Sequence, residues 1–194
     1  MPTVSFTRMS EGTREDYALL EREGRPWVDG LADRLLAALA SLRHGFPGYQ
    51  ISSLDHLLQT ATRAERDGAD EETVVAALLH DIGDVYAPHN HSEFGAALLR
   101  PYVGERTHWV LRHHGIFQLY HYGQQIDVDP NLRERYRDSP YYAACASFCE
   151  RWDQVSFDPR YDAKPLEYFA PVLRQVISRT SWTASSRSDA TQGV

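Results

Sequence analysis

The chain has 194 residues, 42% of them hydrophobic, and a formal net charge of -7 at pH 7. This length suits a single domain with one buried core. The negative charge and the lack of a Lys/Arg cluster argue against nucleic acid as a partner, because nucleic acid binding calls for a basic face. No stretch approaches the ~18 consecutive apolar residues of a membrane span, and no signal pattern opens the chain, so we expect a cytoplasmic protein without a membrane partner. Nothing in the sequence indicates the oligomeric state.

Both ends of the chain are expected to be loose. Residues 1–24 are polar and charged, and residues 181–194 show no hydrophobic periodicity. We therefore expect an N-terminal extension over 1–24, one domain over 25–180 and a disordered C-terminal tail over 181–194.

Between these ends the hydrophobic pattern predicts helices and no strands, so the fold class is all-α. Cys145 and Cys149 lie one helical turn apart in an apolar stretch, which indicates buried thiols rather than a disulfide. Residues 118–140, rich in Tyr, Asp and Arg, are the least regular part. Helices are expected over 31–42, from about 53 to 67, after an N-cap at Asp70, from 92 to about 100, and from 105 to a stop at Gly115.

The end of the helix that follows Asp70 carries the sequence His80-Asp81-Ile82-Gly83-Asp84. Adjacent residues on a helix point about 100° apart, so His80 and Asp81 can address two different metal ions, or Asp81 can bridge both. Nine histidines occur in the chain, and several fall at helix ends or inside helices. This pattern favours a coordination site over isolated surface histidines.

Five short motifs carry a resemblance to a known family: His56-Leu-Leu-Gln-Thr-Ala, His80-Asp81, His91-Ser-Glu-Phe-Gly-Ala, Arg112-His113-His114-Gly115 and Arg151-Trp152-Asp153. Their order resembles the six-ligand version of the HD superfamily, helical metalloproteins named for the adjacent His-Asp pair. The resemblance covers roughly residues 48–179. The local sequences are most similar to myo-inositol oxygenase and the phosphonate-cleaving oxygenases.

The resemblance implies a single HD-domain helical bundle with a dinuclear metal site in its centre. His56, His80 and Asp153 would bind one metal, His91 and His114 the other, and Asp81 would bridge them. Two iron ions, as a mixed-valent Fe(II)/Fe(III) pair, are implied, and a nitrogen and oxygen ligand set also suits manganese or zinc. His89, two residues before His91, is an alternative ligand in its place.

Substrate contacts are expected around these metals. In myo-inositol oxygenase the residues matching Asp84 and Phe157 are lysines and the one matching Gly115 is a serine, so those polar contacts are absent here. Asp84 either orients a ligand imidazole or contacts a cationic group, helped by aromatic faces such as Trp152 or Tyr122. The full set of expected contacts is Asp84, Tyr49, Gln50, His113, Tyr120 and Phe157. Gln59 would hydrogen-bond a metal ligand or bound water, and Tyr49 could instead pack at a helix start. We interpret His44, His108 and His121 as surface residues.

Two functions of different class follow from the resemblance. The first is a diiron oxygenase that uses dioxygen to oxidise or cleave, at a C–C or C–P bond, a small hydroxylated substrate that can also carry an amine. The alternative is a metal-dependent phosphohydrolase acting on a phosphate ester or nucleotide. Phosphoryl chemistry needs cations in the pocket, and Asp84 would repel a phosphate. A metal-binding protein without catalysis is a third possibility.

Overall fold

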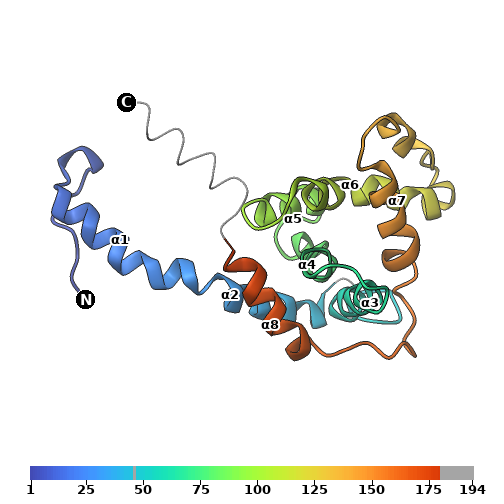
Figure 1. The fold of residues 1–194 in the computed structure, drawn as a ribbon, viewed down its shortest axis with the longest axis horizontal. Helices are drawn as coiled ribbons and strands as arrows, with labels where there is room; N and C mark the ends of the chain where they lie inside the picture. The colour runs from blue at the N-terminus through green and yellow to red at the C-terminus, as the bar shows by residue number, and fades with distance from the viewer. Residues whose placement is uncertain (46, 180–194) are drawn as a thin grey trace.

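The computed structural model describes residues 1–45 and 47–179 (Figure 1). Within these ranges the protein is helical and contains no strand, which confirms the all-α prediction. The α-helices are α1 (Arg14–Asp29), α2 (Leu31–Ser41), α3 (Ser53–Arg66), α4 (Glu71–Leu79), α5 (His91–Leu99), α6 (Glu105–Tyr122), α7 (Tyr142–Phe148) and α8 (Leu166–Ile177). Short 3₁₀ turns cover Met9–Glu11, Leu42–His44, Ile82–Val85, Gly123–Ile126 and Leu132–Tyr136, and a π-helical turn covers Cys149–Asp153.

Helix α4 lies at the centre of the bundle (Figure 1). Every residue of its apolar run 74–79 is buried. A helix that is apolar all round must be covered on all sides. Helices α3, α6 and α8 pack around α4, and α5 and α7 pack on α6. The residue that follows α4 therefore emerges in the interior of the protein.

Side-chain caps explain where two of these helices begin. Ser52 and Asp55 form a capping box at the start of α3, in which each side chain accepts a hydrogen bond from the other residue's backbone N–H. Asp70 caps α4 by accepting a hydrogen bond from the backbone N–H of Thr73 at 2.8 Å. Both starts agree with the sequence prediction.

The N-terminal extension expected over residues 1–24 contains the first part of helix α1. Thr13 and Asp16 form a second capping box, which starts α1, so the expected boundary at residue 24 falls inside this helix. Helix α1 extends away from the bundle, and its C-terminal end contacts the bundle at α2 (Figure 1). The predicted tail over 181–194 lies outside the described residues.

The predicted end of α6 at Gly115 is also wrong, because the helix continues to Tyr122. Gly115 lies where α6 packs closely on α5: a Cβ at this position would be 2.8 Å from Oγ of Ser92. The glycine thus provides room for a neighbouring helix rather than a helix end. The first part of the stretch 118–140 is therefore helical.

Two other predictions concern thiols and membranes. Cys145 and Cys149 are free and buried, as predicted. In the part of the chain that the structure describes, none of the helices combines the length and apolar character needed to cross a bilayer.

Candidate metal centre

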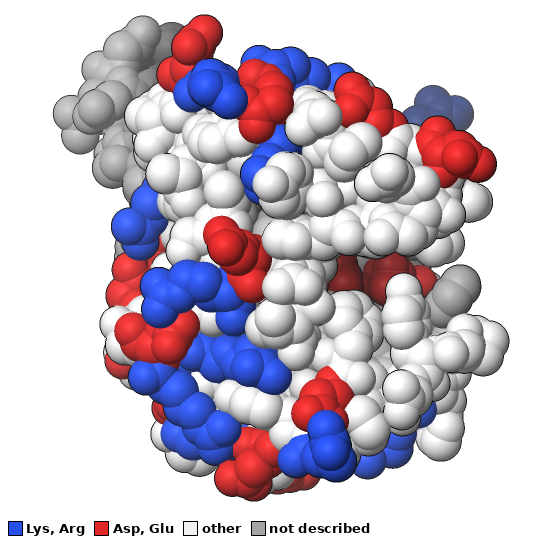
Figure 2. Space-filling model, turned by 90° about the vertical axis from the view of Figure 1, so that its right-hand side faces the viewer, with Lys and Arg blue, Asp and Glu red and all other residues white. Residues whose placement is uncertain are grey.

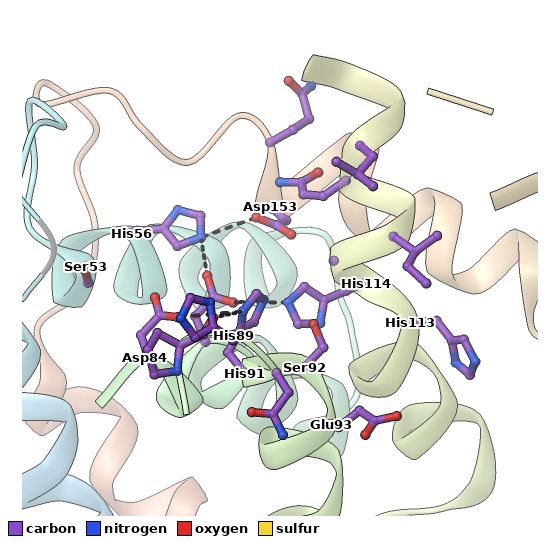
Figure 3. Close-up of a pocket in the computed structure, with 18 of the residues that line it drawn as sticks. Ser53, His56, Asp84, His89, His91, Ser92, Glu93, His113, His114 and Asp153 are labelled. Carbon is purple, nitrogen blue, oxygen red and sulfur yellow. Dashed lines mark hydrogen bonds and ion pairs between the residues drawn. The ribbon is translucent and has the colours of Figure 1, made fainter. Parts of the chain in front are cut away.

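The six predicted metal ligands come from separate parts of the fold and converge at one place. His56 lies in the first turns of α3, His80 and Asp81 follow α4, His91 opens α5 and His114 lies within α6. Asp153 ends the π-helical turn, a feature that the sequence did not predict. Figure 3 shows His56, His114 and Asp153 directed toward a common centre. The six residues form three groups of three that share members. Within each group, one ligand atom from each residue lies within 4.8 Å of the others.

The two carboxylate oxygens of Asp81 are divided between two pairs of histidines. Oδ2 lies 3.6 Å from Nε2 of His56 and 3.2 Å from Nε2 of His80. Oδ1 lies 3.4 Å from Nε2 of His91 and 3.1 Å from Nε2 of His114. A carboxylate placed in this way can hold two cations at the ~3.5–4 Å separation found in two-metal sites.

Asp153 joins the first of these pairs. Its Oδ1 lies 3.3 Å from Nε2 of His56 and 3.6 Å from Nε2 of His80. Its Oδ2 is buried and has no hydrogen-bond partner among the described residues. A buried carboxylate oxygen without a donor is costly, and a metal ion would remove that cost.

Each ligand imidazole turns its Nδ1 toward a backbone carbonyl. Because a carbonyl can only accept, Nδ1 carries the proton and Nε2 of the neutral ring presents a lone pair to the centre. Nε2 of His56 and Nε2 of His80 are only 3.2 Å apart, so their lone pairs need a shared proton or a metal ion beside them. The carbonyls are those of Ser156 for His56 (2.9 Å), Ala77 for His80 (2.8 Å), Leu111 for His114 (2.7 Å) and Pro88 for His91 (3.5 Å).

The pKa values of the cluster show that its centre favours positive charge. Burial opposes the charged form of His80, yet the carboxylates of Asp81 and Asp153 outweigh burial and raise the pKa of His80 well above its usual value. Burial likewise opposes ionisation of Asp81, but the charge of His80 and a hydrogen bond with His114 hold its pKa well below the ordinary range. The pKa of Asp153 is lowered too, chiefly by His80 and His56 against the effect of burial. The donor set therefore fits metal ions with nitrogen and oxygen ligands.

Residues around the ligands hold them in place. The ring of Phe157 stacks on His56 at a centroid distance of 4.4 Å. Gln59 donates a hydrogen bond from Nε2 to the carbonyl of Asp158 at 2.9 Å, so it anchors the loop that carries Phe157. Its Oε1 is buried without a hydrogen-bond partner among the described residues, and its expected bond to a ligand or bound water stays a prediction. Gly83 allows a close approach of α5, because a Cβ there would lie 2.5 Å from Cα of His91.

A cavity of ≈ 1480 Å³ opens beside the cluster. Of the expected substrate contacts, Tyr49, Asp84, His113 and Phe157 line it. His113, however, points away from the metal ligands (Figure 3) and stacks on the ring of Trp109. Figure 2 shows acidic side chains deep in a hollow that is bordered largely by uncharged side chains.

Three further residues lie outside the large cavity or outside the ligand groups, and their expected roles stay predictions. Gln50 lies outside the large cavity and lines a smaller hollow next to it. Tyr120 also lies outside, since its ring packs under the guanidinium of Arg133 at 3.4 Å. His89 lines the cavity but belongs to none of the ligand groups found among the described residues, whereas His91 does.

Sequence reasoning missed Gln118 of the cavity wall, and its interpretation of His121 as a surface residue is wrong, because His121 also lines the cavity. They lie four and seven positions after His114 on α6, and such residues share one face of a helix. Oε1 of Gln118 and Nε2 of His121 are buried without a hydrogen-bond partner among the described residues. The spacing would have revealed them if the helix had not been expected to end at Gly115.

Comparison with known proteins agrees with this centre. The family model described as HD domain matches residues 53–153, a stretch that contains all six converging residues. A relative from Leisingera caerulea, "[1-hydroxy-2-(trimethylamino)ethyl]phosphonate dioxygenase (glycine-betaine-forming)", is 50% identical over 48 residues. The match covers 25% of this chain and 22% of that relative, so it spans about a fifth of the relative's length.

Proposed function

Starting from the fact that this chain belongs to the HD domain family, we propose that it is a dinuclear iron oxygenase. It would use dioxygen to oxidise or cleave a small hydroxylated substrate at a C–C or C–P bond. The observation that carries the proposal is the division of the Asp81 oxygens between two histidine pairs, which suits two cations rather than one. The relative from Leisingera caerulea is a dioxygenase by name, which supports oxygen chemistry over hydrolysis.

Iron, when bound, would supply the redox chemistry that makes dioxygen reactive. His56, His80 and Asp153 would hold one ion, His91 and His114 the other, and Asp81 would be shared. The Nδ1–H bonds to backbone carbonyls fix the tautomer and the ring plane of each imidazole, so the Nε2 lone pairs stay directed at the ions. The ligands therefore need little rearrangement when metal binds.

The surrounding residues would control access to the centre. His80 is completely buried, and the edge-to-face ring of Phe148 covers it at a centroid distance of 5.6 Å. Asp81 and His91 are partly exposed, with side-chain exposures of 22% and 30%. Substrate and dioxygen would thus approach the His91 and His114 side, from the cavity.

The phosphohydrolase alternative receives less support from the cavity wall. Phosphoryl transfer needs cations close to the phosphate oxygens. Arg112 is exposed and pairs with Glu93 at 3.3 Å, and Arg133 lies outside the cavity on Tyr120. Asp84, which lines the cavity, would repel a phosphate.

The test is a metal analysis combined with two activity assays on the purified protein. We expect two irons per chain, a spin-half signal from a mixed-valent pair that changes when amino alcohols are added, and oxygen consumption with a substrate of that class. His91→Ala, which removes a ligand of only one ion, serves as the matched variant and should abolish the spin-half signal. Bound zinc or manganese, with phosphatase turnover and no oxygen consumption, would contradict the proposal and favour the hydrolase.

A further inference from the structure

Asp153 lies at the end of a turn that departs from the α-helix. In the π-helical turn Cys149–Asp153, the backbone N–H of Gln154 donates to the carbonyl of Cys149, five residues earlier, at 3.0 Å. The carbonyl of Glu150, which an α-helix would pair with that N–H, accepts a hydrogen bond from the Gln154 side chain at 3.1 Å instead. One extra residue in a turn rotates the residues that follow by up to about 100° relative to an α-helix. The direction of the Asp153 carboxylate therefore depends on this turn.

The two residues just before Asp153 are bound by a side chain from another part of the fold. Oδ2 of Asp67 accepts hydrogen bonds from Nη2 of Arg151 at 2.8 Å and from Nε1 of Trp152 at 2.6 Å. Asp67 is the residue that follows α3, the helix that carries the ligand His56. Turns of the π type are rare and occur frequently at functional sites. Because the α-helical arrangement is the preferred one, contacts from outside the turn must stabilise the π form, and Asp67 provides such a contact next to the ligand.

Helix α3 also binds the chain just after Asp153. Nη2 of Arg63 donates to the carbonyl of Val155 at 3.0 Å. The Nδ1–H of His56 donates to the next carbonyl along the chain at 2.9 Å. Arg63 and His56 lie four and eleven positions before Asp67, a spacing that places all three on one face of the helix. The ligand Asp153 thus lies between contacts that come from the same helix as the ligand His56.

Neither stability nor coordination of a metal accounts for the contact of Asp67. The side chains of Asp67 and Arg151 are 36% and 55% exposed, and exposed ion pairs add little to the free energy of unfolding. Asp67 belongs to none of the ligand groups found among the described residues, and it does not line the large cavity. Asp67 can, however, act on the metal centre through the π-helical turn that it holds.

We propose that Asp67 is a positioning residue of the metal centre, which holds the π-helical turn so that the Asp153 carboxylate reaches the same ion as His56 and His80. This inference rests on the two-metal centre of the proposed function and not on its oxygen chemistry. It adds a residue outside the cavity that controls one of the two ions, because Asp153 would be a ligand of only one.

Titration of the metal-free protein with iron(II), without oxygen and in competition with a chelator, tests the inference. Asp67→Ala should weaken one of the two metal sites by about tenfold and leave the affinity of the other unchanged, since residues that orient metal ligands commonly alter affinity by ~10–100-fold. Asp67→Asn should restore most of the lost affinity, because its amide oxygen can accept both hydrogen bonds that Oδ2 accepts. If Asp67→Asn bound metal as weakly as Asp67→Ala, the charge of Asp67 would be the cause, and the inference would be overturned.

The Asp153→Ala background separates positioning from a general loss of structure. In that background Asp67→Ala should leave the affinity of the remaining site unchanged, because the carboxylate that Asp67 positions is gone. Arg66→Gln is the matched control: Arg66 lies next to Asp67 and donates from Nη2 to the carbonyl of Asp162 at 2.9 Å, beyond the π-helical turn. This variant should bind both metals as tightly as the wild type.

Unchanged affinities in Asp67→Ala, an equal loss at both sites, or a loss that persists in the Asp153→Ala background would overturn the inference. If Asp67→Ala does not fold, Trp152→Phe gives the same test, because it removes the indole N–H and keeps an aromatic ring. It should weaken the same single site, and unchanged affinity there would also overturn the inference. Since these titrations need no turnover, the two proposals fail separately: two tight sites without oxygen consumption would refute the oxygenase and leave the role of Asp67 standing.

Discussion

Substitution of Gly83 by alanine should remove one of the two metal ions. A Cβ at this position would lie 2.5 Å from Cα and 2.6 Å from the carbonyl oxygen of His91, whereas ordinary contacts begin near 3.4 Å. Both atoms belong to the backbone, so the start of α5 must move by about 0.9 Å, the difference between 3.4 and 2.5 Å. Metal–nitrogen bonds of ~2.0–2.1 Å tolerate changes of only about 0.2 Å. His91 would thus leave its ion.

We therefore expect Gly83→Ala to bind one metal per chain where the wild type binds two. The assay is elemental analysis after equilibration with a buffered concentration of free metal. Overpacking should also lower the free energy of unfolding of the variant by ~1–3 kcal/mol, which denaturant titration would measure.

Gly24→Ala is the matched control for this substitution. Gly24 lies inside α1, and a Cβ there would meet nothing within 4 Å. The control should keep both metals and gain up to ~1 kcal/mol of stability, since alanine favours helix over glycine. If Gly83→Ala retained two metals at the wild-type affinity, the role given to His91 would be refuted.

Three further predictions concern the N-cap of α3, the ligand Asp153 and the dependence of stability on pH. Ser52→Ala should lower the free energy of unfolding by ~1 kcal/mol through loss of the capping box without changing the metal content, and an unchanged denaturation midpoint would contradict this. Asp153→Ala should leave one tight metal site in a metal titration, because the ion of His91 and His114 does not use this carboxylate; two tight sites would argue against the assignment. In metal-free protein the raised pKa of His80 contributes stability that is complete below about pH 6.5 and is lost as the pH rises through the raised value. Denaturation should show stability falling as the pH rises above about 6.5, the ordinary histidine value, and added metal removing the fall, whereas stability rising with pH there would contradict it.

The candidate ligand set could be proposed from the sequence because the order of its motifs resembles that of a known family. The His80-Asp81 pair was also indicated by its position, since it follows an apolar run that must be central. The start of α1 could also have been predicted, since the capping box of Thr13 and Asp16 is a local signal. The charged composition of residues 1–24 had indicated an extension without a helix.

Other features depended on contacts between distant residues. Whether Gly115 ends α6 depends on Ser92 of α5, which packs against it, and no local pattern contains that contact. The π-helical turn before Asp153 has no signature in the residues that form it. That Asp84 has a long ion pair with His91, at 3.8 Å, follows only from the way the fold places these two residues.

The most direct test is a crystal structure of the iron-loaded protein with anomalous scattering at the iron edge. We expect two iron peaks about 3.5–4 Å apart, with one oxygen of Asp81 on each, His56 and His80 at one iron, and His91 and His114 at the other. A single peak, or two peaks that do not share Asp81, would contradict the two-metal centre and the chemistry proposed for it.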